Sequence, residues 1–128
     1  MSVFKVEGSP KLRRYTRQRL FAVDAPLCPA QFGRTQIERL VPHRDPFLLV
    51  DYIQGFNIKE GLIVGRYTAR RDDPIFHGHF PGNPVFPGTL LMEMLGQIGI
   101  ALLTLIKNGG VLPEEDLAPP AAFVIKVE

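Results

Sequence analysis

Short apolar runs along the chain predict the strands of a sheet. Phe47–Ile53 begins with apolar residues and Leu62–Ala69 follows it, and between them Asn57–Gly61 contains the Asn and Gly that favour a turn. We therefore expect two antiparallel strands joined by that turn. A third run, Ala121–Glu128, predicts another strand that stops in mid-run, so we expect this sheet to be incomplete.

A longer apolar stretch predicts a helix over Gly88–Lys107. Pro87 opens the stretch and Asn108–Gly110 closes it, as is typical of helix ends. The helix would be apolar around nearly its whole circumference, and Glu93 is its only interior charge. A transmembrane span has to be considered on length alone. Glu93 and Gln97 within the stretch argue against it, because polar groups are costly in lipid.

The remaining segments are irregular or short. Thr35–Val41 predicts a short amphipathic helix that ends at Pro42. Asp72–Gly88 contains four prolines and three glycines, so we expect a loop without regular structure. We treat residues 1–34 as an N-terminal basic extension, which is either solvated or a landing surface for an acidic partner. Its basic residues include Lys5, Lys11, Arg13, Arg14, Arg17 and Arg19.

Composition narrows the class of protein. With 128 residues, 45% of them hydrophobic, and a net charge of +2, the chain is typical of one globular domain and not of a nucleic-acid-binding protein. Cys28 is the only cysteine, so no intrachain disulfide can form. The first ten residues contain no secretory apolar segment. We expect a cytoplasmic protein.

Candidate chemistry gathers in the loop and the helix that follows it. Desolvation on an apolar helix disfavours the charged form of a carboxylate, which makes Glu93 a candidate proton donor. The loop holds His79 among prolines, and an imidazole changes charge near physiological pH. Gly88 begins the helix, where free backbone N–H groups can polarise a carbonyl oxygen. An acid, a base and an oxyanion donor are therefore all present.

Two segments then point to a family. Gly78–Gln97 (GHFPGNPVFPGTLLMEMLGQ) resembles the signature of the 3-hydroxyacyl-acyl-carrier-protein dehydratases of fatty acid synthesis. Leu40–Asp51 (LVPHRDPFLLVD) is similar to the same family's N-terminal motif. The resemblance covers about residues 37–107 and resumes weakly at Ala121–Glu128.

The resemblance implies a role for each of five residues. His79 matches the family's catalytic histidine, and Glu93 matches its helix carboxylate. Gly88 matches the backbone N–H that polarises the thioester carbonyl, and Val85 the residue whose carbonyl orients the imidazole. Gln97 matches a glutamine that holds the carboxylate or a water.

The same resemblance implies an α+β hot-dog fold, in which a curved antiparallel sheet wraps around a long central helix. It places this domain at residues 35–128, and we expect it to be truncated at its C-terminus. The implied reaction is the cofactor-free dehydration of a (3R)-3-hydroxyacyl thioester to the trans-2-enoyl thioester. The implied partners are an acyl carrier protein with a phosphopantetheine-linked substrate and a second copy, because the family's site lies between protomers of a homodimer or of a larger oligomer of dimers.

Other interpretations of the site and of the function compete with this one. His77-Gly-His79 invites a metal site, but zinc needs three or four protein ligands, so we expect none. His43 and Arg44 are ionisable too, but the resemblance implies a mainly structural role, so neither is included in the site. The function itself has two competitors, a hot-dog acyl thioesterase and a non-catalytic acyl-binding or dimerisation module. Thioester hydrolysis does not call for a His-Phe-Pro-Gly loop, which favours dehydration.

Overall fold

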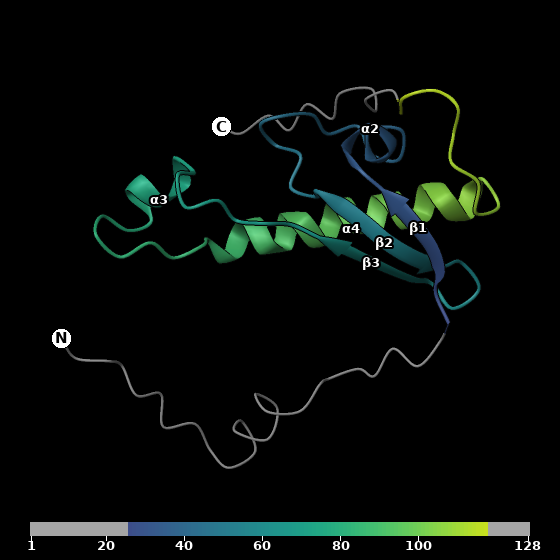
Figure 1. The fold of residues 1–128 in the computed structure, drawn as a ribbon, viewed down its shortest axis with the longest axis horizontal. Coiled ribbons are helices and arrows are strands. Elements are labelled where there is room, and N and C mark those ends of the chain that lie inside the picture. Colours follow the sequence, from purple (N-terminus) through teal and green to yellow (C-terminus); the bar gives the residue numbers. More distant parts are fainter. Residues whose placement is uncertain (1–25, 118–128) are drawn as a thin grey trace, which may run out of the picture.

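The structure, a computed structural model, describes residues 26–117 and has the predicted α+β architecture. A three-stranded antiparallel sheet in the order β1-β2-β3 packs against one long helix, α4 (Figure 1). The basic extension up to residue 25 and the predicted strand Ala121–Glu128 lie outside the described residues. The elements are β1 (Cys28–Phe32), α2 (Arg34–Ile37), β2 (Tyr52–Asn57), β3 (Leu62–Arg66), α3 (Ile75–Gly78) and α4 (Gly88–Lys107).

The bounds of α4 are those that the sequence predicts. Pro87 is the N-cap with extended backbone, and the helix begins at Gly88. After the C-cap Asn108, Gly109 and Gly110 have φ values of 62° and 85°. These angles lie in the left-handed region, which glycine enters without a steric penalty, so the two glycines stop the helix.

The predicted turn between β2 and β3 is also confirmed. The Asn57 side-chain Oδ1 accepts hydrogen bonds from the backbone N–H groups of Lys59 and Glu60, both at 3.1 Å. Gly61 completes the turn with a φ of 63°. An asparagine that bonds to the backbone just after it stabilises a turn locally, so the hairpin register is fixed by its own loop.

The predicted strand over Phe47–Ile53 begins five residues late, at Tyr52. Leu48, Leu49 and Val50 before it are buried and Phe47 is exposed, and the backbone of this segment pairs with side chains. The Leu49 N–H donates to Gln97 Oε1 and the Phe47 carbonyl accepts from Gln97 Nε2, both at 2.8 Å, while Arg34 Nη2 donates to the Leu48 carbonyl at 3.1 Å. Backbone groups that are satisfied in this way need no neighbouring strand.

Strand β1 lies entirely inside residues 1–34, the segment that the sequence analysis treats as an extension. It pairs antiparallel with β2, and a register irregularity between Pro29 and Phe32 coincides with Gln31, whose φ is 46°. Pro29 has no N–H to donate, none of the five residues of the strand is buried, and its apolar residues show no clean alternation. This bulged strand therefore carries almost none of the sequence signals of a strand, and the folded unit begins before residue 35.

Of the two short helices, α2 is shorter than predicted and α3 was not predicted. Helix α2 stops at Ile37, although hydrogen-bonded turns continue and bury Leu40 and Val41 completely, so the predicted apolar docking face is confirmed. The loop at 72–88, expected to lack regular structure, contains the four-residue helix α3. Pro74 occupies its N-cap, where a missing N–H costs no helical hydrogen bond, so proline does not prevent this turn.

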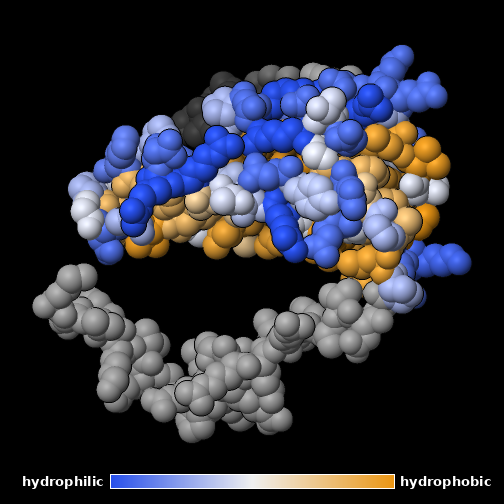
Figure 2. All heavy atoms as spheres, viewed as in Figure 1, coloured by the Kyte–Doolittle hydropathy of each residue, from blue (hydrophilic) through white to orange (hydrophobic). Residues whose placement is uncertain are grey.

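Helix α4 buries one side in this chain and leaves others open. Its buried residues are Gln97, Ala101, Thr104 and Leu105, of which Ala101 and Leu105 belong to one core cluster with residues of α2 and β2. By length and composition α4 could also cross a membrane. Figure 2 shows apolar surface along the lower edge of the described fold, below a mostly polar band. The large apolar side chains that α4 exposes are Leu91, Met92, Leu95, Leu103 and Ile106.

Gln97 supports the fold through the backbone of residues 47–49, which gives a stability prediction. We expect Gln97→Leu to lower the free energy of unfolding by about 2 kcal/mol, because it leaves the buried Leu49 N–H without an acceptor. Urea unfolding followed by circular dichroism measures the change. The matched control is Gln54→Leu on the exposed side of β2, where we expect a change within about 0.5 kcal/mol. Equal losses in the two variants would contradict this role of Gln97.

Candidate active site

His79 is held by a tight hairpin that the Pro-Gly sequence builds. The Val85 N–H donates to the His79 carbonyl at 2.9 Å. Within that pair, Phe80 and Asn83 exchange two backbone hydrogen bonds of 3.1 and 2.9 Å around Gly82, whose φ is 72°. The imidazole stacks on the ring of Phe80, with centroids 4.2 Å apart. The loop is therefore an ordered support for one side chain.

The carbonyl of Val85 fixes the tautomer of His79. His79 Nδ1 lies 2.7 Å from this oxygen. A carbonyl oxygen only accepts hydrogen bonds, so Nδ1 carries the proton and the neutral ring keeps a free lone pair on Nε2. An imidazole oriented in this way can act as a general base. The structure thus supplies the contact that the family resemblance implies for Val85.

Glu93 is anchored through one of its two carboxylate oxygens. Gln97 Nε2 donates to Glu93 Oε1 at 2.9 Å, and His43 Nε2 lies 3.3 Å from the same oxygen. Among residues 26–117, no hydrogen bond or ion pair reaches Oε2. The Glu93 side chain is 33% exposed, so a ligand can reach it from outside.

Gly88 provides the first N–H of α4. The four N–H groups at a helix start have no partner within the helix, and the dipole adds partial positive charge there. A Cβ built on Gly88 would meet nothing within 4 Å in this chain. The space next to this N–H is therefore open to a ligand, as the predicted oxyanion role requires.

His79 and Glu93 are not joined within the described chain. No hydrogen bond or ion pair connects the two side chains in residues 26–117. Helix α3, which ends just before His79, lies beyond the N-terminal end of α4 and away from the sheet (Figure 1). The base and the carboxylate are thus two separately organised halves of a candidate site.

An apolar cavity of about 360 Å³ lies between β3 and α4. Glu93 is not part of its lining, but the Leu49 N–H in its wall donates to Gln97, which in turn donates to Glu93. Tyr67 gives the wall one hydroxyl group. Burial raises the pKa of Tyr67, and Asp73 and Asp51 raise it further, so the phenol stays neutral. The lining residues are Leu49, Val50, Gly65, Arg66, Tyr67, Leu91, Met94, Leu95 and Ile98.

His77 lies in the last turn of α3, two residues before His79. Over the described part of the chain, no three His, Cys, Asp or Glu side chains gather closely enough to hold a metal ion. Cys28 is exposed on β1, in an element distant in sequence from the loop. The geometry of residues 26–117 therefore offers acid and base groups and no metal ligand set.

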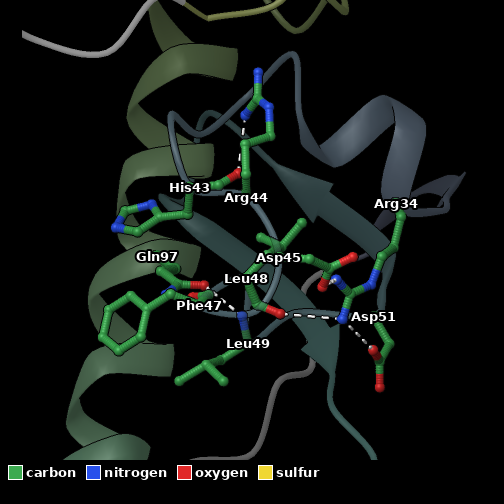
Figure 3. A network of polar contacts seen from close by, with 9 residues as sticks. All are labelled: Arg34, His43, Arg44, Asp45, Phe47, Leu48, Leu49, Asp51 and Gln97. Carbon is green, nitrogen blue, oxygen red and sulfur yellow. Dashed lines mark hydrogen bonds and ion pairs between the residues drawn. The ribbon is translucent and has the colours of Figure 1, made fainter.

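The structure brings His43 to the site, although the sequence analysis set it aside. Figure 3 shows its imidazole beside α4, next to Gln97 and Phe47. Its neighbour Arg44 is structural, as expected, because Nη1 donates to the carbonyls of Val41 and His43 at 3.0 and 2.8 Å. Fifty positions separate His43 from Glu93 in the sequence, so no local spacing signals their contact.

Comparison with known proteins finds relatives that share one name. The 3-hydroxyacyl-acyl-carrier-protein dehydratase FabZ of Chlamydia trachomatis serovar L2 is 42% identical over 96 residues, which are 75% of this chain and 59% of the relative. The enzyme of the same name from Chloroflexus aggregans is 46% identical over 79 residues, 60% of this chain and 54% of the relative. The enzyme of that name from Sulfurimonas denitrificans is 34% identical over 93 residues, which are 73% of this chain and 60% of the relative.

The chain thus spans somewhat more than half the length of these relatives. A family model described as the FabA-like domain matches residues 41–120, which contain the His79 hairpin, Gly88 and Glu93. That match includes nearly all of both segments in which the sequence resembles dehydratases, and it agrees with the predicted hot-dog fold. The chain belongs to the FabA-like domain family.

Proposed function

We propose that this protein dehydrates a (3R)-3-hydroxyacyl thioester to the trans-2-enoyl thioester. The observation that carries the proposal is the 2.7 Å contact of His79 Nδ1 with the Val85 carbonyl, which leaves Nε2 free as a base. A fixed base next to a thioester is suited to removing the acidic proton on C2. The names of the relatives, all 3-hydroxyacyl-acyl-carrier-protein dehydratases, support the same reaction.

Each group of the site has one task in this reaction. His79 Nε2 takes the C2 proton while the Gly88 N–H stabilises negative charge on the thioester oxygen. The C3–O bond then breaks, and the hydroxyl leaves as water after it receives a proton. Glu93 supplies that proton directly, or His79 returns it while Glu93 orients the departing water. Both routes use Glu93 Oε2, because Oε1 is already occupied.

The active site of this proposal lies between two copies of the chain. His79 and Glu93 are unconnected within residues 26–117, which supports a site completed by a second protomer. The exposed apolar side chains near the start of α4, Leu91, Met92 and Leu95, offer a surface that such a copy would cover. We infer a homodimer on these grounds, and larger assemblies would be built from it.

The acyl group of the substrate arrives on an acyl carrier protein in this proposal, within fatty acid or related biosynthesis. The relatives' names support that partner. The part of the basic extension that could steer an acidic carrier, from Lys5 to Arg19, lies outside the described residues. A cytoplasmic location is part of the same proposal, and Cys28, the single and exposed cysteine, is consistent with it.

We assign the apolar cavity beside α4 to the acyl chain, because its walls are apolar and Leu49 in its wall is linked to Glu93 through Gln97. We expect Met94→Glu to lower kcat/KM for long acyl chains by about tenfold or more, because it places a charge in the wall. Short-chain substrates should lose much less. The control Leu103→Glu introduces the same charge on an α4 residue outside this wall. Equal losses for short and long chains would contradict the assignment.

One assay tests the proposed function against its competitors. The protein is incubated with a 3-hydroxyacyl thioester, and enoyl formation and free thiol are followed in parallel. We expect enoyl product without thiol release. Thiol release without enoyl product would identify a thioesterase, and neither product from a well-folded protein would favour a binding module.

A further inference from the structure

We propose that His43 is a positioning residue that determines which oxygen of Glu93 meets the substrate, an inference that rests on the proposed dehydration. His43 Nε2 and Gln97 Nε2 both reach Oε1, at 3.3 and 2.9 Å. Because Gln97 donates to Oε1 and the His43 imidazole lies beside the same oxygen, Oε2 is the oxygen left for the reaction. His43 thus acts through Glu93 and needs no contact with substrate.

The backbone around His43 is held firmly enough to serve this role. Thr104 Oγ1 donates to the Leu40 carbonyl at 2.9 Å, which ties the segment to α4. Arg44 Nη1 donates to the His43 carbonyl itself, and Arg44 Nη2 pairs with Asp116 at 3.2 Å. The imidazole packs against Phe47, with ring centroids 6.3 Å apart. The ring is therefore restrained by both its backbone and its neighbours.

The surroundings of Nδ1 select one form of the imidazole. Within the described part of the chain, His43 Nδ1 is buried and has no hydrogen-bond partner. The carboxylate oxygen at Nε2 requires a donor there, so Nε2 carries a proton. A second proton on Nδ1 would create a buried N–H without an acceptor, which is costly. This geometry favours the tautomer of His43 that has its proton on Nε2.

This form of His43 complements the role of Gln97. Gln97 alone could hold Oε1 while the carboxylate rotates about its last bond. A second donor from a different segment restricts that rotation and keeps Oε2 directed toward the open side. Accurate placement of a reacting group is worth a large rate factor, even when the restraining residue does not touch the substrate.

Three substitutions at His43 separate donation from packing. His43→Phe keeps an aromatic ring on Phe47 and removes the donor, so we expect kcat to fall about tenfold with KM within about twofold. Thermal stability should not fall, because the unpartnered Nδ1 is removed as well. His43→Gln places an amide nitrogen where Nε2 lies and should recover most of kcat. His43→Asn places its amide nitrogen where Nδ1 lies and should not.

A second readout needs no turnover. The carboxyl carbon signal of Glu93 is followed by ¹³C NMR in the full chain and is identified by its loss in Glu93→Gln. We expect the signal to move in His43→Phe and His43→Asn and to return toward its original position in His43→Gln. A merely structural role of His43 predicts no such pattern among the three variants.

The outcomes are distinguishable. An unchanged kcat in His43→Phe, or an equal loss in His43→Gln and His43→Asn, would overturn the positioning role while wild-type dehydration stands. The expected NMR pattern in a protein that forms no enoyl product would overturn the proposed reaction but support the pairing of His43 with Glu93. The expected pattern in both readouts supports the two together.

Discussion

His79→Ala and Glu93→Ala should each reduce enoyl formation by about 10²- to 10⁴-fold, the range that general acid–base groups contribute. Both side chains are partly exposed, and neither belongs to the buried core, so thermal unfolding should change little. Steady-state kinetics with a 3-hydroxyacyl thioester, together with a melting curve for each variant, measures the two effects. A variant that keeps most of its kcat would remove that residue from the proposed mechanism.

Mixing the two inactive variants tests whether the site lies between protomers. After random exchange of subunits, half of the dimers pair one variant with the other, and one of the two sites in such a dimer has both wild-type side chains. We therefore expect recovery of about a quarter of the wild-type activity. Mass spectrometry of the intact dimers verifies the exchange. No recovery despite complete exchange would place both groups in one chain.

Gly88→Pro should lower kcat/KM by about 10²- to 10³-fold, the usual effect of removing one oxyanion donor. Proline removes the N–H and is otherwise well suited to this position, because the first residue of a helix tolerates it. Pro87, just before it, has extended backbone with a ψ of 129°, which a following proline requires. The melting temperature should therefore be maintained while the activity falls.

The matched control for that variant is Gly88→Ala. Alanine keeps the N–H, and its Cβ meets nothing within 4 Å in this chain. We expect a loss of activity much smaller than that of the proline variant. If alanine and proline were equally damaging, the open space next to Gly88 would matter and the N–H would not. That result would contradict the oxyanion role.

How far the sequence predicts the fold depends on where each signal is encoded. The bounds of α4 are predictable because Pro87 and the glycines after Asn108 act locally. The same holds for the turn that follows Asn57. The start of β2 is not predictable, because the partner of the backbone at Leu49 is Gln97, 48 residues further on. Strand β1 is missed because its pairing partner, and not its own composition, makes it a strand.

In the candidate site, too, features encoded by adjacent residues are predictable and contacts between distant segments are not. The His79 hairpin is encoded in adjacent residues, so its prolines and Gly82 are enough to predict a rigid loop. The contact of His43 with Glu93 depends on how two distant segments pack, and no pattern in the sequence indicates it. A local motif can identify a reacting group, but tertiary packing decides which oxygen of that group is free.

Gln97 bears on how freely the chain can vary around its site. The Gln97 amide bonds to the Leu49 N–H, the Phe47 carbonyl and Glu93, so the position of Glu93 depends on backbone groups. Every residue except proline has both of these backbone groups. Neighbouring apolar side chains can therefore be exchanged over evolution without moving the carboxylate. A proline at position 49 would remove the one donor on which this tolerance depends.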